Sequence, residues 1–156
     1  MSKKLTRFGF EKLQAEYEDL LYSKRPKVVQ GVTNAAAEGD RSENAEYTYG
    51  KKRLREIDKR LGYLAALLKG VQVVDIQKLD LSRVNFGAWV EIEDSEGQVK
   101  SFRIVGEGET YFYPDAISER SPMAQGLLGK KLGDVGEVHR PKGVMEFEVK
   151  KIEAKA

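Results

Sequence analysis

Residues 54–71 read LREIDKRLGYLAALLKGV, and the apolar residues in this stretch recur at a regular interval. They are separated by 3, 4, 3, 4 and 3 residues, in the order Leu54, Ile57, Leu61, Leu64, Leu68 and Val71. This interval places one apolar side chain per turn on a single helix face, which is typical of the seam between two packed helices. The stretch therefore predicts a long amphipathic helix that needs a partner helix.

The N-terminal residues can supply that partner. Thr6 is a helix-capping residue, and Pro26 predicts a kink because proline has no backbone N–H to donate. Apolar residues follow Thr6 at helical spacing, at Phe10, Leu13, Tyr17 and Leu20, and again at Val28, Val32 and Ala35. Two helices joined by a short connection run antiparallel, so residues 6 to about 74 predict a helical hairpin with its turn near Gly39 to Asn44. Helices of about thirty residues are about 45 Å long, so we expect the hairpin to protrude as an arm.

Beyond residue 75 the apolar period changes from helical to alternating. The segments WVEIED (89–94) and VKSFRIVG (99–106) flank a turn at Gly97 and predict a β-hairpin, with Trp89 in the core. Ser121 and Pro122 are typical of a helix start, and this short helix is expected to run through Leu128 and stop at Gly129.

The last part of the chain predicts a closing pair of strands. The segments VGEVHR (135–140) and VMEFEVKKI (144–152) are separated by a PKG turn, with Val144, Phe147 and Val149 expected to face partly inward. The fold class is therefore α+β. We expect an antiparallel coiled-coil hairpin over residues 1–75 and a small α+β domain over residues 80–156, joined near residues 75–83.

Composition narrows the functional classes. The chain has 27 basic and 25 acidic residues, a net charge of +2, which excludes an overall basic coat for nucleic acid. It has no cysteine and one histidine, so a metal would be held by oxygen ligands or by His139, which we expect to be a surface residue. No apolar run is long enough for a membrane span, and the N-terminus lacks the apolar region of a signal peptide. The expected location is the cytoplasm.

Two acids in the predicted turn, Asp40 and Glu43, are spaced i, i+3, so in a helical turn both carboxylates point the same way. One interpretation is that they are solvated caps of the kind found near many hairpin turns. The other is that they form half of a magnesium site, because Mg²⁺ commonly takes one or two protein carboxylates and completes its shell from elsewhere.

A basic run follows the acids. Residues 51–60 contain six basic and two acidic residues, a local charge of 6 − 2 = +4. Lys52, Arg55 and Lys59 share one face away from the leucine seam, and Lys51 and Arg53 flank it. This face is either simply solvated or a track for single-stranded nucleic acid, in which phosphates pair with cations and a base stacks on a ring. Of the nearby rings, Tyr49 is the stronger candidate, since Tyr47 falls on the seam.

Several separated motifs together resemble one known family. The segments GDRSENAEY, KKRLREIDKR, FGAWVEIED, FRIVG and ISERSPMAQGLLGKKLGD occur in this order and are similar to those of the bacterial transcript cleavage factors GreA and GreB, more so to GreB. The resemblance covers essentially the whole chain. It implies an N-terminal antiparallel coiled coil, an FKBP-like C-terminal domain, and binding to bacterial RNA polymerase when the nascent RNA 3′ end has backtracked into the secondary channel.

The resemblance also implies roles for individual residues. Asp40 and Glu43 match the family's acidic tip pair, which helps to hold the second catalytic Mg²⁺ of the polymerase. Lys52, Arg53 and Arg55 match the patch that holds extruded RNA, and we extend the RNA-binding set to Arg41, Lys51 and Lys59. Ser121, Pro122 and Met123 match the loop that docks to the polymerase. By this resemblance the protein is not itself an enzyme but stimulates the polymerase, and it is expected to be monomeric when free.

Three alternatives remain at this point. An inhibitory relative of the same architecture would occupy the channel without assisting cleavage, and the intact acidic pair favours the active kind. A prolyl isomerase would share the FKBP-like fold and is distinguished by an isomerase assay. A zinc-containing channel factor is disfavoured by the absence of cysteine.

Overall fold

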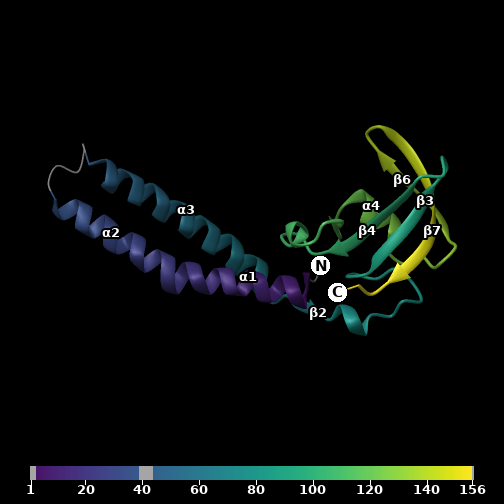
Figure 1. The fold of residues 1–156 in the computed structure, drawn as a ribbon, viewed down its shortest axis with the longest axis horizontal. Coiled ribbons are helices and arrows are strands. Elements are labelled where there is room, and N and C mark those ends of the chain that lie inside the picture. The colour runs from purple at the N-terminus through teal and green to yellow at the C-terminus, as the bar shows by residue number, and fades with distance from the viewer. Residues whose placement is uncertain (1–2, 39–43, 156) are drawn as a thin grey trace. The chain divides into compact units, whose positions relative to one another are not determined.

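The computed structural model describes residues 3–38 and 44–155, and the chain forms two compact units. One unit is helical and comprises Glu11–Lys69. The other combines the described residues up to Phe10 with those from Gly70 onward, and it contains the strands. Each unit is described by itself below (Figure 1).

A nearly continuous helix forms the first side of the hairpin. It consists of α1 (Arg7–Asp19), a π-helical turn (Leu20–Lys24) and α2 (Arg25–Ala37). The second side is α3 (Ala45–Leu68), which lies alongside α2 in Figure 1. The predicted cap is confirmed, since the Gly9 N–H donates to Thr6 Oγ1 over 3.1 Å. The predicted α+β class, with a helical hairpin ahead of a β-rich unit, is confirmed as well.

The π-helical turn keeps the seam of the first helix continuous. Leu13 and Leu20 are seven residues apart, as are Val28 and Ala35, but eight residues separate Leu20 from Val28. A π-helical turn accommodates one extra residue, and here the Arg25 N–H donates to the Leu20 carbonyl, five positions earlier. Pro26 follows in the first turn of α2. The irregularity expected at this proline therefore lies just ahead of it, where a widened turn relieves the clash of the ring with the preceding carbonyls.

Between the two sides of the hairpin lies a thin apolar seam. Its buried members are Leu13, Leu20, Ala35, Ile57, Leu61 and Leu64. Gly50 allows close approach of the helices, because a Cβ atom added there would lie 2.6 Å from Val32 Cγ2. The seam is therefore closed by small residues as well as by leucines.

The end of α3 corrects one prediction. The regular spacing extended the helix through Val71, but α3 ends at Leu68, and Gly70 has a φ of 67° in the left-handed region that favours glycine. The following residues form strand β2 (Gln72–Val74), which pairs in parallel with β1 (Lys4–Thr6). Val71, at the expected heptad position, therefore lies between the end of α3 and the start of β2.

A five-stranded sheet forms the body of the second unit, in the order β5-β4-β3-β7-β6. Its strands are β3 (Trp89–Asp94), β4 (Val99–Val105), β5 (Ala116–Ser118), β6 (Val135–Arg140) and β7 (Gly143–Glu153). Only β5 runs parallel to its neighbour. The predicted hairpin of β3 and β4, with Gly97 at positive φ, and the closing pair β6 and β7 are both confirmed.

The core of this unit lies between the sheet and the short helix α4 (Pro122–Leu127). Its members include Val90, Ile92, Ile104, Ala124, Leu127, Val138, Met145, Phe147 and Val149. Two predicted core residues are wrong. Val144 is exposed because the alternation on β7 places Met145, Phe147 and Val149 inward, and Trp89 is only half-buried, with Lys155 Nζ lying 3.5 Å from its ring centre.

A buried carboxylate holds the first residues of the chain to the sheet unit. Glu109 accepts hydrogen bonds from the Thr6 N–H (2.9 Å), the Thr6 hydroxyl (2.5 Å) and the Gly106 N–H (2.8 Å). Burial raises the pKa of Glu109, and these hydrogen bonds oppose that effect. The carboxylate needs both neighbouring glycines, since a Cβ at Gly9 would lie 2.0 Å from Glu109 Oε1 and one at Gly106 2.3 Å from the Lys4 carbonyl oxygen.

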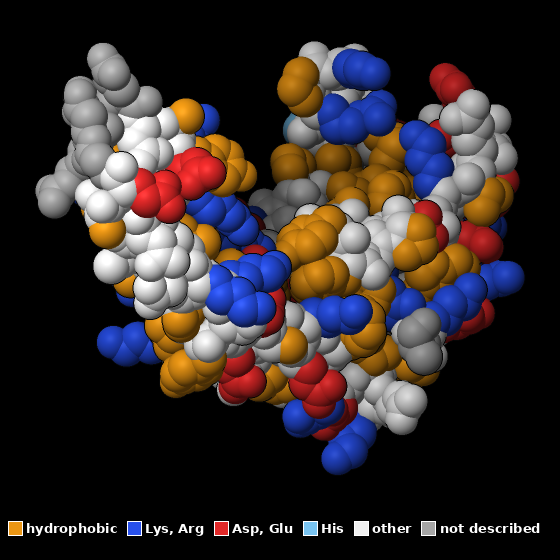
Figure 2. Space-filling view, turned by 60° about the vertical axis from the view of Figure 1, so that its left-hand side comes forward, with side chains coloured by type: hydrophobic (Ala, Val, Ile, Leu, Met, Phe, Trp, Pro, Cys, Tyr) orange, Lys and Arg blue, Asp and Glu red, His pale blue; other side chains and the backbone are white. Residues whose placement is uncertain are grey.

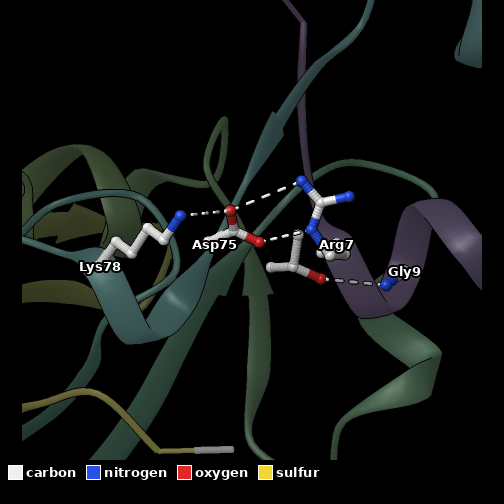
Figure 3. A network of polar contacts seen from close by, with 5 residues as sticks. Arg7, Gly9, Asp75 and Lys78 are labelled. Carbon is white, nitrogen blue, oxygen red and sulfur yellow. Dashed lines mark hydrogen bonds and ion pairs between the residues drawn. The ribbon is translucent and has the colours of Figure 1, made fainter.

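A second, exposed polar contact lies close by. Figure 3 shows Arg7 and Lys78 on either side of Asp75, with Arg7 Nε 2.5 Å and Lys78 Nζ 3.9 Å from its carboxylate oxygens. The hydrogen bond from Arg7 lowers the pKa of Asp75. Together with the β1–β2 pairing, these contacts join the first residue of α1 to the segment that follows β2.

Candidate nucleic-acid interface

The predicted acidic pair and the nearest predicted RNA contact lie outside the described residues: Asp40, Arg41 and Glu43. The residues on both sides of them are described. Among residues 3–38 and 44–155, no three His, Asp or Glu side chains are grouped closely enough to hold a metal ion. The structure therefore does not test Asp40 and Glu43 as magnesium ligands, and this role remains a prediction.

Asn44 joins the two helices where they approach the undescribed segment. Its side-chain Oδ1 accepts from the Tyr47 N–H over 3.1 Å, which caps α3, and its Nδ2 donates to the Ala35 carbonyl of α2 over 2.8 Å. The sequence pattern predicts only a turn position for Asn44. Its capping role could have been recognised from its position directly before a helical apolar pattern.

The predicted basic residues lie together on α3. Lys51, Lys52, Arg55 and Lys59 are exposed and Arg53 is half-buried, while the buried positions Ile57, Leu61 and Leu64 occupy the opposite side of the helix. In Figure 2, Lys and Arg side chains gather in separate clusters along the hairpin, with acidic side chains between some of them. The basic face of α3 is thus a local feature, in agreement with the low net charge.

Acids near this face are neutralised by arginines. Asp58 lies 2.7 Å from Arg25 of α2, and Glu56 lies 3.7 Å from Arg53. The hydrogen bond from Arg25 lowers the pKa of Asp58, so this acid stays ionised and paired.

One ion pair joins the two sides of the hairpin farther from the undescribed segment. Glu16 of α1 accepts two hydrogen bonds from Arg60, at 2.7 and 2.8 Å, and these lower the pKa of Glu16. In contrast, Lys52, Arg55 and Lys59 have no carboxylate within ion-pair distance among the described residues. Their positive charges remain available to an external anion.

Three tyrosines lie on α3. Tyr47 is half-buried, as its seam position indicated, and Lys51 Nζ lies 5.6 Å from its ring centre. Tyr49 is 70% exposed, which leaves its ring accessible. Tyr63 is 45% exposed and was not identified in the sequence analysis.

The predicted docking residues lie at the start of α4. Ser121 is a structural cap whose hydroxyl accepts from the Ala124 N–H over 3.2 Å and donates to the Ser118 carbonyl over 2.7 Å. Met123 is half-buried and packs against the core, and Pro122 is exposed. Of the three residues, Pro122 is therefore the one that presents its side chain to solvent.

Two other surface features belong to the sheet unit. A pocket of about 850 Å³ is lined by Phe8, Ile76, Phe112, Tyr113 and Pro114, with Arg7, Asp75, Gln77 and Lys78 around them. No sequence motif predicted it, because its walls come from three separate segments. His139 is exposed on β6 and lies 3.4 Å from Glu137, in agreement with the expected surface position.

No helix among the described residues is long and apolar enough to cross a membrane. Solved structures that resemble the chain include GreA factor homolog 1 of Thermus thermophilus, 26% identical over 98% of this chain and 99% of that one, with a TM-score of 0.46. A GreA/GreB factor from Nitrosomonas europaea is 16% identical over 97% of this chain and 98% of that one, with a TM-score of 0.42.

Sequence comparison is more informative. Transcription elongation factor GreB of Vibrio cholerae is 46% identical over 153 residues, which cover 97% of this chain and 95% of the relative. GreB of Haemophilus influenzae is 48% identical over 151 residues, covering 97% and 96%. Residues 3–73 match the model described as the N-terminal domain of the transcription elongation factor, and residues 79–154 match the GreA/GreB C-terminal domain. With both parts matched, the chain belongs to the GreA/GreB family of transcription elongation factors.

Proposed function

We propose that this protein binds bacterial RNA polymerase through the secondary channel and stimulates cleavage of the backtracked nascent RNA 3′ end, which releases arrested complexes. The observation that carries the proposal is family membership over both parts of the chain, combined with an acidic pair between the two helices of the hairpin. The protein would act in the cytoplasm, where the polymerase works.

The helix ends support a role for the segment between them. Because Asn44 caps α3 and also hydrogen-bonds the Ala35 carbonyl, the last turn of α2 and the first turn of α3 are held together. The connection contains only residues 38–44, and two of them are Asp40 and Glu43. A helix of 24 residues such as α3 is about 36 Å long, which suits an arm that reaches into a channel.

The chemistry of these two acids fits a magnesium ion. Carboxylate oxygens are the ligands that Mg²⁺ prefers, and two carboxylates leave coordination positions for water or phosphate oxygens. Asp40 and Glu43 would hold the ion and orient the attacking water, and the polymerase would provide the remaining ligands. When bound, such an ion supplies charge stabilisation for the attacking and leaving oxygens. With only part of the site, the protein is a cofactor of the polymerase rather than a nuclease.

The basic face supports a role in holding RNA. Lys52, Arg55 and Lys59 are exposed without carboxylate partners among the described residues, so each can neutralise a phosphate. Ser121, Pro122 and Met123 would dock to the polymerase, with Pro122 making the direct contact and Ser121 and Met123 shaping the start of α4.

The test uses a backtracked elongation complex with end-labelled RNA. Wild-type protein is expected to shorten the transcript, and Asp40→Asn is expected to lower the cleavage rate on the order of 100-fold, since it removes the charge that the cation needs. The matched control is Glu38→Gln, which removes an exposed acid at the end of α2. Competition with wild type measures polymerase binding, which both variants should retain.

Two outcomes would refute the proposal. A wild-type protein that binds the polymerase but blocks cleavage would identify the inhibitory kind of relative. Equal cleavage by wild type and Asp40→Asn at low magnesium concentration would show that the acidic pair is not the active element.

A further inference from the structure

The pocket of the sheet unit has no part in the proposed function. We call it the aromatic pocket, after its apolar lining of Phe8, Ile76, Phe112, Tyr113 and Pro114. Its volume of about 850 Å³ lies within the range of about 300–1,000 Å³ that is typical of small-molecule sites. Its walls come from the first turn of α1, a 3₁₀ turn after β2 and a second 3₁₀ turn after β4, all within one compact unit.

The ring of Phe8 is both packed and accessible. Its centre lies 6.2 Å from that of Phe112, with the two ring planes at 86°, and 5.7 Å from that of Tyr113. Phe8 nevertheless keeps 48% of its surface exposed. A large apolar side chain that stays half exposed beside a cavity offers contact area to a ligand.

Tyr113 is held in place by two contacts with buried residues. Its hydroxyl lies 2.7 Å from Thr6 Oγ1, and the guanidinium carbon of Arg103 lies 4.8 Å from the centre of its ring. Arg103 is buried, and Thr6 is itself buried and bound to Glu109. Because these contacts orient the ring before a ligand arrives, little side-chain entropy is lost on binding. This wall of the aromatic pocket is therefore preformed.

The charged lining residues of the aromatic pocket favour an anion. They are Arg7 and Lys78, which lie on either side of Asp75 (Figure 3), so their formal charge is 2 − 1 = +1. The Lys78 side chain is 82% exposed, and its Nζ is 3.9 Å from the Asp75 carboxylate. An exposed ion pair at this distance is weak, so the ammonium can turn to an acidic group of a ligand.

We propose that the aromatic pocket binds a small molecule in which a planar aromatic ring carries an anionic group. The ring packs against Phe8, Phe112 and Tyr113, and the anionic group lies near Arg7 and Lys78. Apolar and aromatic walls with a few polar groups that fix orientation are the usual composition of such sites. Nucleotides and aromatic carboxylic acids share this chemistry. The proposal is independent of the proposed function, which uses none of these residues.

The experiment measures binding of the fluorescent aromatic anion anilinonaphthalene sulfonate to the free full-length protein. Phe8→Ala is expected to weaken binding between about 2-fold and about 12-fold, the range that corresponds to loss of one aromatic contact. Phe8→Tyr should bind like the wild type, because it keeps the ring. The matched control is Tyr22→Ala, which removes a ring that is 75% exposed on the first side of the hairpin. Circular dichroism checks that each variant is folded.

A neutral probe of similar shape, phenylnaphthylamine, separates the charge from the ring. Lys78→Gln should weaken sulfonate binding by up to about 5-fold, and Asp75→Asn should strengthen it by a similar factor, since exposed charges contribute up to about 1 kcal/mol. Neither variant should change binding of the neutral probe. Lys142→Gln, at an exposed lysine in the turn between β6 and β7, is the control and should bind both probes like the wild type.

Competition identifies the source of the ring. Displacement of the sulfonate probe by AMP or by indole acetate supports the proposal, and the stronger competitor shows whether a nucleotide or an aromatic carboxylic acid fits better. Displacement by neither compound, or equal affinity of wild type and Phe8→Ala for the sulfonate, would overturn the proposal. An affinity for the sulfonate that Lys78→Gln and Asp75→Asn leave unchanged would also overturn it, because the occupant would then be an uncharged apolar group, such as a side chain of a partner protein.

Discussion

The helical hairpin and the sheet unit use their residues in opposite ways. The hairpin buries a narrow apolar seam, with Leu13, Leu20, Ala35, Ile57, Leu61 and Leu64 as its buried members. The sheet unit instead has a packed core between five strands and α4, and it buries a carboxylate, Glu109, in addition. Most hairpin side chains therefore remain at the surface, where their charges can contact other molecules.

Because of this difference, we expect stability to depend mainly on the sheet unit and function mainly on the hairpin surface. A two-helix hairpin has little interior, and cross-helix ion pairs such as Arg25–Asp58 and Arg60–Glu16 supplement its seam. Exposed pairs of this kind contribute little individually. We therefore expect substitutions on the hairpin surface to change binding and activity, and substitutions in the sheet unit to change folding.

The largest effect is expected in the core of the sheet unit. Phe147→Ala removes a fully buried aromatic ring and should lower the free energy of unfolding by about 3–5 kcal/mol. Leu64→Ala in the seam should cost about 2–3 kcal/mol, at the low end of the range for buried leucine, because two helices can close over a small cavity. Urea unfolding followed by circular dichroism measures both. Val144→Ala, at an exposed position on the same strand as Phe147, is the control and should have almost no effect.

A larger loss from Leu64→Ala than from Phe147→Ala would contradict this comparison. It would mean that the seam, and not the sheet, limits the stability of the chain.

The buried carboxylate predicts a pH dependence that belongs to the sheet unit alone. Because burial raises the pKa of Glu109 above its ordinary value of 4.5, the folded state binds a proton that the unfolded state has released. Stability from this group is therefore complete below the ordinary pKa and is lost as pH rises through the raised pKa, with a slope of at most about 1.4 kcal/mol per pH unit. Unfolding free energies of wild type and Glu109→Gln, measured from pH 4 upward, should diverge in this window.

Glu109→Gln is a suitable probe because its amide oxygen can still accept from the Thr6 and Gly106 N–H groups, which both donate to one carboxylate oxygen. The nearby carboxylate of Glu119, whose pKa is also raised by burial, is unchanged in both proteins. Parallel pH profiles for the two proteins would show that Glu109 does not change its protonation on folding.

The smallest effect on stability is expected from substitutions at two glycines within α3. Gly62 has no atom within 4 Å of an added Cβ, so Gly62→Ala should stabilise the hairpin by about 1 kcal/mol through helix propensity. At Gly50 the added Cβ would lie 2.6 Å from Val32 Cγ2, so Gly50→Ala should lose this gain by separating the helices. Thermal unfolding of the two variants gives the comparison. An equal increase in Tm for both would show that the helices are not closely packed at Gly50.

Much of the secondary structure could be predicted because its signals act over a single turn. The cap at Thr6, the helix start at Ser121 and the hairpin turn at Gly97 each depend on neighbouring residues, and all three are confirmed. The basic face of α3 followed in the same way, since helical spacing alone separates Lys52, Arg55 and Lys59 from the seam. Of the predicted functional residues, Asp40, Arg41 and Glu43 lie outside the described residues and remain predictions.

The roles of Val71 and Gly50 depend on segments far apart along the chain. Helical spacing assigned Val71 to α3, but the segment that follows it pairs with β1, some seventy residues earlier. Helix propensity alone predicts only a cost to stability at Gly50, whereas its missing side chain makes room for Val32 of the facing helix. In both cases a partner from elsewhere in the chain determines what the residue does.

By itself the sequence determined the helical hairpin, the alternation of the strands, the family and the charged face, because periodicity and short motifs are local properties. The tertiary structure alone decided that Glu109 is buried against Thr6, 103 residues away, and that Asp58 pairs with Arg25 of the facing helix and Arg60 with Glu16. The physical reason is that the environment of a charged side chain depends on groups brought close by folding, and no local pattern encodes those groups.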